Sequence, residues 1–378
     1  IILKQSAEFA RVHKQRFSFR AQDRIVFKNF VTKSTATMEQ WIAQTLLMIV
    51  VLMAPAAALL LGCSRSRWMC FILLGLVSTV CFLCICVWIS LFCDQQHPGD
   101  QPNLRQFLRN FTFGAHRGLA DEAPENTLAA FEYSAKLGST FVEFDLEMTA
   151  DNTPVLMHDD TVDRTTNGTG FIGQLDDDYV FSLNTAAKFK NGNFSVQKVP
   201  TLEEAVLLIK KLNMKMIIDV KRSDSKVIDA ITSLFEKYPD LYDTVAVSSF
   251  HPQVAFKIVK ADPKIITGHT WCRGYLYQQS CDDPTPRYNF SLFHYGAIIV
   301  ENIYHWLLHD VIINFTGARL ILAERRLVSQ DYIDYANKRG LHVVVWTVNK
   351  LSEQEYFYKV LRCAFMSDHL TDFVNNNF

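Results

Sequence analysis

The chain has 378 residues, a formal net charge of −1 at neutral pH and an apolar fraction of 49%. A near-neutral chain lacks the basic excess that is typical of nucleic-acid binding, so no nucleic-acid partner is expected. The length exceeds that of one average domain but fits a single large α/β barrel.

The chain starts with a basic stretch that precedes the first methionine, Met38. Residues 1–37 contain several Lys and Arg and no apolar periodicity. We interpret them as a basic leader, either translated upstream sequence or the edge of a fragment, and exclude them from fold reasoning.

Two long apolar runs follow, at Trp41–Gly62 and Trp68–Cys93. Each has the length, about 20 residues, that a bilayer-spanning helix needs. The alternative is a signal peptide followed by a buried helix, but a signal has an apolar region of only ~7–15 residues and is not paired. We therefore predict that residues 38–93 form a transmembrane helical hairpin, so that the protein is multi-pass and contacts the lipid bilayer.

The orientation of this hairpin depends on whether the basic leader is genuine. If the protein starts at Met38, Arg65 and Arg67 keep the short loop cytoplasmic, and the chain after Cys93 is lumenal or extracellular. If the leader is genuine and stays cytoplasmic, the rest of the chain is cytosolic. Candidate glycosylation sites favour the lumenal or extracellular side, in an endomembrane or the plasma membrane. These sequons lie at Asn110, Asn167, Asn193, Asn289 and Asn314.

Two cysteines of the later chain, Cys272 and Cys281, are close enough in sequence to form a disulfide in an oxidising compartment. The sequence leaves open whether they do.

Residues 94–108, which begin with a polar segment containing Pro and Gly, are interpreted as a linker to one domain at 109–378. In that domain, short β-rich runs alternate with helical patterns. The expected strands are 112–115, 141–148, 155–157, 216–220, 245–248, 265–268, 319–322 and 342–348, and the expected helices include 126–137, 202–212, 226–237 and 329–338.

This alternation predicts an α/β fold in which a parallel sheet closes into a TIM (β/α)8 barrel. An open doubly wound sheet is the alternative, but it usually carries a Gly-rich phosphate loop, which is absent from this sequence.

The run Phe141–Met148 (FVEFDLEM) alternates apolar and acidic residues. Because alternate residues of a strand share a face, Glu143, Asp145 and Glu147 are expected to point into the barrel while the apolar residues face the helices. Carboxylates stacked in a confined space repel one another unless a cation compensates. A hard divalent ion with oxygen ligands does this, whereas an exposed acidic edge strand is the alternative.

Two histidines, His116 and His158, each end an expected strand. Active sites of such barrels lie at the carboxyl ends of the strands. One imidazole can accept a proton while the other donates one, as displacement at a phosphate ester requires. The neighbouring Arg117 suits a bidentate hold on phosphate.

A third strand ends with Asp219 and Lys221 on one face, which suggests a further metal ligand and an ammonium that contacts phosphate. Trp346 ends the last expected strand, where it forms either a wall for the substrate or part of the core.

Together these motifs resemble the glycerophosphodiester phosphodiesterase family, over about residues 109–370 and in the family's order. Within the family, the chain is most similar to the membrane-bound type-1 branch. The resemblance rests on His116-Arg117-Gly118, Pro124-Glu125-Asn126-Thr127, Glu143-x-Asp145, Thr149-x-Asp151, His158-Asp159, Asp219-x-Lys221 and Trp346-Thr347-Val348-Asn349.

The resemblance implies a metal-dependent hydrolase that converts glycerophosphodiesters to glycerol 3-phosphate and an alcohol. It assigns acid–base catalysis to His116 and His158, and metal binding to Glu143, Asp145 and Asp219. It further assigns substrate or phosphate contacts to Arg117, Glu125, Lys221 and Trp346. Mg²⁺ is the expected cofactor and Ca²⁺ the alternative. Many relatives have Glu where this chain has Asp219, so the shorter side chain must reach the ion from further back.

The type-1 resemblance implies glycerophosphoinositol and glycerophospho-N-acylethanolamines as candidate substrates. Two other functions are weighed against this one. The first is a lysophospholipase D-type or cyclising lipid phosphodiesterase, and the second is a catalytically silent membrane scaffold, which the complete set of charged site residues argues against.

The segment His294–Glu324 is apolar but interrupted by ionisable residues such as Glu301 and Asp310. These interruptions argue against a third membrane span. An interfacial surface beside the barrel mouth is one interpretation of this segment, and barrel core is the other.

Overall fold

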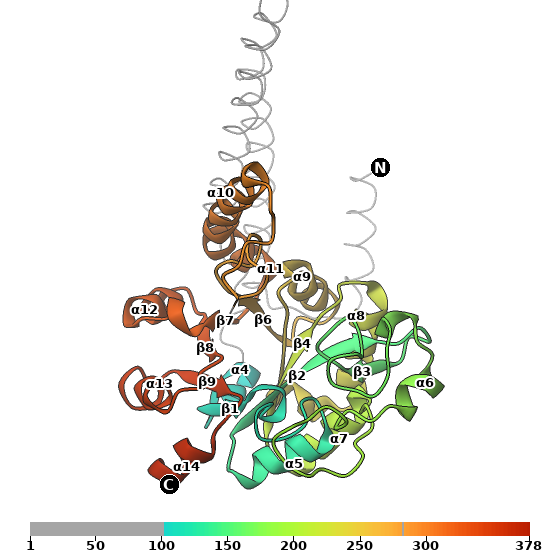
Figure 1. The fold of residues 1–378 in the computed structure, drawn as a ribbon. Coiled ribbons are helices and arrows are strands. Elements are labelled where there is room, and N and C mark those ends of the chain that lie inside the picture. The colour runs from blue at the N-terminus through green and yellow to red at the C-terminus, as the bar shows by residue number, and fades with distance from the viewer. Residues whose placement is uncertain (1–101, 282) are drawn as a thin grey trace, which may run out of the picture. The chain divides into compact units, whose positions relative to one another are not determined.

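The computed structural model describes residues 102–281 and 283–378 (Figure 1). The leader, the predicted hairpin at 38–93 and the first part of the predicted linker lie outside the described residues. Within the described part of the chain, no helix is both long enough and apolar enough to cross a membrane.

Eight parallel strands close into a barrel, as predicted. Each strand pairs with the next around the ring, and the ring closes because β1 pairs with both β2 and β9. The barrel strands are β1 (Phe113–Ala115), β2 (Phe141–Met148), β4 (Lys215–Val220), β5 (Val245–Ser248), β6 (Ile266–Trp271), β7 (Leu320–Glu324), β8 (His342–Trp346) and β9 (Ala364–Ser367).

The ninth strand, β3 (Pro154–Leu156), does not belong to the ring, and the prediction that counted it as a barrel strand is wrong. It pairs antiparallel with the end of β2. Only the short turn after Met148 joins the two strands, whereas a parallel connection needs a crossover of about a dozen residues. The strand that takes its place in the barrel is β9, which the sequence analysis did not identify.

The alternation in β2 places its two faces as expected. Phe144 and Leu146 belong to the large cluster between the strands and the helices, while Phe141 belongs to the cluster inside the barrel. Glu143 and Asp145 have the parity of Phe141 and therefore also face inward.

Helices surround the ring, and four of them match the predicted ranges closely. These are α5 (Leu128–Lys136), α7 (Leu202–Lys211), α8 (Ser225–Lys237) and α12 (Gln330–Lys338). The others are α4 (Pro102–Leu108), α6 (Asp177–Ser182), α9 (Pro252–Ala261), α10 (Ser291–Leu307), α11 (Ile313–Thr316), α13 (Leu351–Glu355) and α14 (Thr371–Asn377).

The last residues of the predicted linker form α4, so the barrel begins earlier than residue 109. Phe107 of α4 is fully buried and packs with Phe111 in the cluster inside the barrel. Phe111 also stacks on Phe141, with ring centroids 4.1 Å apart. The polar part of the linker, rather than all of it, is therefore the boundary that the sequence indicates.

One part of the segment His294–Glu324 belongs to the barrel core, and another part lies at the surface. Its end is β7, whose residues are all buried in the barrel. Its beginning lies in α10, where several apolar side chains are exposed.

Removing the Phe365 side chain should destabilise the barrel, because this residue of the closing strand is fully buried and packs against Phe113 of β1 and Phe373 of α14. We expect Phe365→Ala to lower the free energy of unfolding by about 3–5 kcal/mol, measured by denaturant unfolding of the detergent-solubilised chain. The control Val360→Ala, whose side chain is 64% exposed, should change it by less than about 0.5 kcal/mol. Equal effects of the two substitutions would contradict the role of β9 in closing the barrel.

Candidate active site

Three carboxylates meet inside the carboxyl end of the barrel. Asp145 on β2 lies directly opposite Asp219 on β4 in the parallel register, and Glu143 precedes Asp145 on the same face. All three are buried, and each offers an oxygen within 4.8 Å of the others. Closely spaced carboxylate oxygens are the ligands that hard divalent cations prefer.

The electrostatics of this trio show how crowded its charges are. Burial and the charge of Asp145 raise the pKa of Glu143 to about 7. Burial alone would also raise the pKa of Asp145, but Lys221 and Arg117 hold it well below its usual range. The pKa values of these neighbouring carboxylates thus shift in opposite directions, and a bound cation would relieve the repulsion between their ionised forms.

Asp219 is fixed from two sides. The hydroxyls of Ser248 on β5 and Thr270 on β6 both donate to its Oδ1, at 3.1 Å each. The Lys221 ammonium lies 2.7 Å from Asp219 Oδ2 and 2.8 Å from Asp145 Oδ1. Lys221 therefore bridges two acids of the trio in this structure, on the face that the sequence analysis assigned to it together with Asp219.

The chain leaves β1 in a tight turn that brings the side chains of His116 and Arg117 to the trio. Arg117 has a positive φ of 50°, and its backbone N–H donates to Glu143 Oε2 at 3.0 Å. The next residue must be Gly118, because its φ is +80° and a Cβ would lie 2.7 Å from Ala130 Cβ.

The Arg117 guanidinium lies within 3.4 Å of Asp145 and 3.3 Å of Glu125. Its buried Nε makes the ion pair with Asp145 Oδ2 but forms no hydrogen bond among the described residues. A buried N–H without a hydrogen bond can donate one to an anionic ligand.

His116 is oriented by a carboxylate that the sequence analysis missed. Its Nδ1 lies 2.6 Å from Asp368 Oδ1, and its Nε2 points toward Glu143 at 3.9 Å. Burial alone would lower the pKa of His116, but the Asp368 carboxylate outweighs this and raises it. Asn349 donates to the other oxygen of Asp368 at 2.8 Å. Asp368 directly follows β9, so it was missed together with that strand.

His158 follows β3 and has a similar arrangement. Its Nδ1 lies 2.6 Å from Asp159 Oδ1, and Arg164 pairs with the second oxygen of Asp159 at 2.6 Å. Arg164 also donates to both oxygens of Glu125, at 2.7 Å each. Each histidine therefore has a carboxylate at Nδ1, which leaves Nε2 available to a reactant.

Asn126 is a second residue whose role the sequence analysis did not identify. It begins the expected helix range 126–137, but α5 starts at Leu128 and its N-cap is Thr127. Asn126 adopts a φ of 57° and is buried. Its amide nitrogen donates to Asp145 Oδ2 at 2.8 Å and its carbonyl oxygen accepts from the Asp145 backbone at 3.1 Å, which fixes the central acid of the trio.

These groups open into one cavity of about 450 Å³. The acids, both histidines, Arg117 and Lys221 line one part, and an apolar part includes Phe250, Tyr275 and Trp346. The indole N–H of Trp346 donates to the Leu322 carbonyl at 3.0 Å, so its ring is fixed as a wall. Of the predicted site residues, only Glu125 does not line this cavity among the described residues. Glu125 instead forms ion pairs with both Arg117 and Arg164.

Comparisons with known proteins fit this geometry. The model of the glycerophosphoryl diester phosphodiesterase family matches residues 116–371. The chain belongs to this family. Human glycerophosphodiester phosphodiesterase 1 is 36% identical over 262 residues, which cover 68% of this chain and 78% of that protein. A glycerophosphodiester phosphodiesterase of Caldanaerobacter subterraneus is 28% identical over 252 residues, or 65% of this chain and 88% of that protein.

Solved structures share the fold. A phosphodiesterase of Oleispira antarctica, solved with its product sn-glycerol-3-phosphate, is 21% identical and has a TM-score of 0.53, covering 70% of this chain and 97% of that chain. A putative glycerophosphoryl diester phosphodiesterase of Silicibacter pomeroyi is 18% identical, with a TM-score of 0.54 over 70% of this chain and 94% of that one.

The comparisons confirm the predicted family, the similarity to its type-1 branch and the enzyme class. The protein is thus a phosphoric diester hydrolase that acts on glycerophosphodiesters. The buried acidic trio fits the divalent metal that the family resemblance implies.

Two further features that the sequence analysis singled out lie among the described residues, the cysteine pair and the candidate glycosylation sites. Cys272 and Cys281 form a disulfide with their Cα atoms 6.0 Å apart, which answers the question that the sequence left open. Among the candidate glycosylation sites, Asn314 is half-buried in α11. The exposed candidates are Asn110, Asn167, Asn193 and Asn289.

Asp368→Asn tests the pair that orients His116. An acid must be protonated to act, so activity that depends on it is lost as the pH rises through its pKa. Removing the Asp368 charge lowers the pKa of His116, so the basic limb of the kcat/KM profile should move to lower pH, with a maximum reduced by about 10²-fold. The exposed Asp372→Asn in the same segment is the control. If the basic limb of Asp368→Asn does not shift, deprotonation of His116 is not what produces that limb.

Proposed function

We propose that the enzyme releases glycerol 3-phosphate from glycerophosphodiesters by acid–base catalysis with His116 and His158, beside a divalent cation held by Glu143, Asp145 and Asp219. The observation that carries this proposal is the meeting of two carboxylate-oriented imidazoles and one buried acidic trio in a single cavity. We further propose that the enzyme is anchored in a membrane by the apolar runs at 41–62 and 68–93.

The metal proposal is supported by the donor set. Three buried carboxylates offer hard oxygen ligands, and burial together with the charge of Asp145 raises the pKa of Glu143 to about 7, which a cation beside the trio would oppose. A bound divalent ion would supply charge neutralisation for the phosphate oxygens. Mg²⁺ is the proposed ion and Ca²⁺ the alternative, since both prefer oxygen ligands.

The acid–base assignment follows from the partners of the two histidines. Asp368 stabilises the protonated form of His116, so we assign His116 as the acid that protonates the leaving alcohol. His158 is the base, because its Asp159 partner is shared with Arg164, which offsets part of the carboxylate charge. In this arrangement, Asp368 and Asp159 are positioning residues.

Arg117 and Lys221 are proposed to contact the phosphate. Support for Arg117 comes from its buried Nε without a hydrogen-bond partner among the described residues. Lys221 is tied to Asp145 and Asp219, so it would contact phosphate from among the acids that it bridges. Trp346 would form a wall for the substrate, and Glu125 would act through Arg117.

The resemblance to the family also implies a cyclic phosphate intermediate, for which the two histidines can make the proton transfers. The glycerol 2-hydroxyl oxygen attacks phosphorus as His158 takes its proton, and the bond from phosphorus to the alcohol oxygen breaks as His116 gives a proton to that oxygen. Water then opens the cyclic phosphate with the proton transfers reversed, which returns both histidines to their starting states. Product release as sn-glycerol-3-phosphate would match the ligand of the Oleispira antarctica enzyme.

The substrate class is proposed from the type-1 similarity and the two-sided cavity. Glycerophosphoinositol and glycerophospho-N-acylethanolamines both carry the glycerophosphate that the charged side would bind. On the apolar side, Phe250 stacks on Tyr275 with ring centroids 5.0 Å apart. This side suits the N-acylethanolamine, which is the less polar of the two alcohols.

The compartment is proposed to be lumenal or extracellular. The Cys272–Cys281 disulfide and the exposed candidate glycosylation sites both suit that side of the membrane. Arg65 and Arg67, between the apolar runs, would then face the cytoplasm.

Histidine and metal removal test the catalytic proposal. With glycerophosphoinositol and Mg²⁺, the full chain should release glycerol 3-phosphate, and EDTA should stop the release. His116→Ala and His158→Ala should each lower kcat by about 10²–10⁴-fold, because each removes one proton transfer. His342→Ala, at the opposite end of the barrel, is the matched control. Full activity in either site variant would end its catalytic assignment, and a persistent cyclic product would point to a cyclising phosphodiesterase instead.

Glycosidase treatment tests the compartment. On expression in a secretory-competent eukaryotic cell, the protein should lose mass on removal of N-linked glycans, and Asn193→Gln or Asn289→Gln should each reduce that loss, because both residues are exposed. A glycan-free protein whose Cys272 reacts with a thiol reagent before reduction would place the barrel in the cytosol.

A further inference from the structure

The helix α10 has the reverse of the usual distribution of polar and apolar residues. A surface helix normally buries its apolar stripe and exposes charged residues. In α10, the residues toward the barrel include His294, Glu301 and Tyr304, all buried or half-buried. We define the outer face of α10 by its exposed apolar side chains, which are Leu292 (71% exposed), Phe293 (64%), Tyr295 (64%), Ile299 (61%), Val300 (55%), Ile303 (44%) and Trp306 (39%).

Charge is missing from this outer face. The only Asp, Glu, Lys or Arg in α10 is Glu301, which is 7% exposed and turned inward. Its carboxylate accepts hydrogen bonds from the backbone of Gly274 at 2.6 Å and Leu276 at 2.8 Å. The one charged side chain of the helix thus holds a loop in place, and the outer face has no charged side chain.

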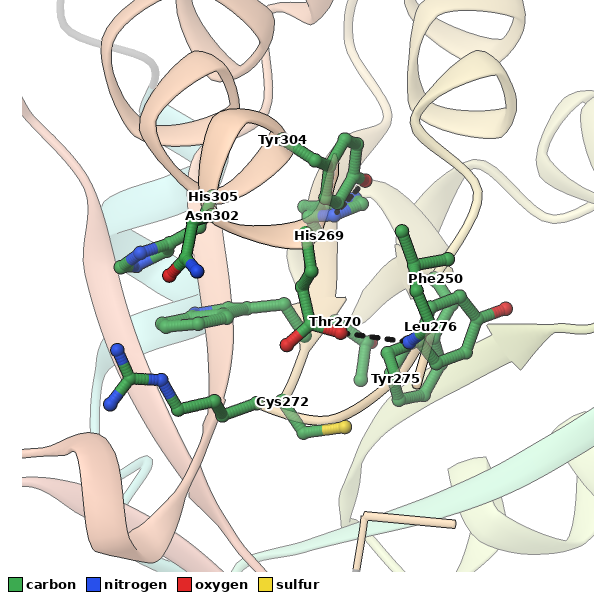
Figure 2. Close-up of a pocket in the computed structure, with 12 residues that line it drawn as sticks. Phe250, His269, Thr270, Cys272, Tyr275, Leu276, Asn302, Tyr304 and His305 are labelled. Atoms are coloured by element: carbon green, nitrogen blue, oxygen red, sulfur yellow. Dashed lines mark hydrogen bonds between the residues drawn. The ribbon is translucent and has the colours of Figure 1, made fainter. Parts of the chain in front are cut away.

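That loop leads directly to the active-site cavity. It contains the Cys272–Cys281 disulfide, and its residue Tyr275 lines the cavity. Figure 2 shows Cys272, Tyr275 and Leu276 of the loop facing Asn302, Tyr304 and His305 of α10. Four residues before α10 starts, Arg287 also lines the cavity and donates to the Gln278 carbonyl at 2.9 Å. The outer face therefore belongs to a helix that is joined to the cavity rim at both the loop and its own start.

The chemistry of the outer face fits a lipid surface. Trp and Tyr are enriched where a protein meets the boundary of lipid and water, and aliphatic side chains enter the acyl region. Ordinary protein-binding surfaces are only about as apolar as the rest of the protein surface, and they have a polar rim.

The chain also limits how far the barrel can lie from a bilayer. The second apolar run ends at Cys93, and α4 begins at Pro102. At about 3.5 Å per residue, the stretch between them reaches at most about 30 Å. If the apolar runs span a membrane, some face of the barrel must therefore lie near it.

We infer that the outer face of α10 docks on the lipid bilayer and sets the cavity rim at the membrane surface, so that the enzyme takes glycerophosphodiesters with a long acyl chain directly from the lipid. This inference rests on the proposed membrane attachment and deepens it. Leu292, Phe293 and their neighbours enter the interface, while Glu301 holds the rim loop in place.

The test compares two substrates in the full chain, reconstituted in phosphatidylcholine vesicles. One is a glycerophospho-N-acylethanolamine with a long acyl chain embedded in the vesicles, and the other is glycerophosphoinositol in solution. We expect Phe293→Glu/Ile299→Glu to lower the rate on the embedded substrate by about tenfold or more, with the rate on the soluble substrate unchanged. The matched control is Val196→Glu/Val360→Glu, which adds the same charge at exposed apolar residues elsewhere and should leave both rates unchanged.

A photoactivatable phosphatidylcholine in the same vesicles gives a direct readout of lipid contact. It should label the peptide Tyr288–Arg319 in the wild type, and this labelling should fall in Phe293→Glu/Ile299→Glu. Labelling at the peptide together with the selective loss of rate supports the inference.

Each other outcome overturns a different statement. An unlabelled peptide, or an unchanged rate on the embedded substrate, overturns lipid docking while hydrolysis of glycerophosphoinositol leaves the proposed activity intact. A dimer in detergent that Phe293→Glu/Ile299→Glu converts to monomers assigns the outer face to a second copy and also overturns it. A wild type that hydrolyses neither substrate contradicts the proposed function itself.

Discussion

The structure depends on one electrostatic constraint, the confinement of three carboxylates at the carboxyl end of the barrel. Because Asp145 and Asp219 lie opposite each other in the parallel register, their charges cannot separate without breaking the sheet. Asn126 holds Asp145, the hydroxyls of Ser248 and Thr270 hold Asp219, and Lys221 bridges the two acids. Their geometry makes an oxygen-rich site that attracts a divalent cation.

The rest of the site is arranged around this charge. The turn after β1 has positive φ at Arg117 and Gly118, which costs conformational energy, yet it brings a backbone N–H and a guanidinium to the acids. The two histidines line the same cavity as the trio, and each has its own carboxylate at Nδ1. Carboxylates therefore have two uses here. The trio offers oxygen ligands for a cation, while Asp368 and Asp159 each hold an imidazole in one orientation.

A second constraint acts on the surface rather than in the core. In α10, the inward face carries the polar groups, because Glu301 is needed to hold the loop that forms the cavity rim. The outward face is left without charge, which costs free energy in water and is favourable against an apolar surface. The same helix thus connects the rim of the active site with the face that we assign to the membrane.

The barrel class, the alternation of β2 and most residues of the cavity could be predicted from the sequence. This was possible because strand periodicity is local, and because His116, Glu143, Asp145 and Asp219 each end or occupy a recognisable strand. The errors of the prediction have local causes too. The short β9 lacked a clear pattern, and β3 was counted with the barrel strands although the turn that precedes it is too short for a parallel connection.

Contacts between residues far apart in the sequence depend on how the whole chain folds, and the sequence patterns did not predict them. Asp368 reaches His116 across 252 positions of sequence, and Glu125 contacts Arg117 and Arg164 instead of lining the cavity. The outward direction of the apolar face of α10 was equally beyond the sequence. Apolar periodicity gives a face, whereas the packing of the whole chain decides whether that face meets the core or the surroundings.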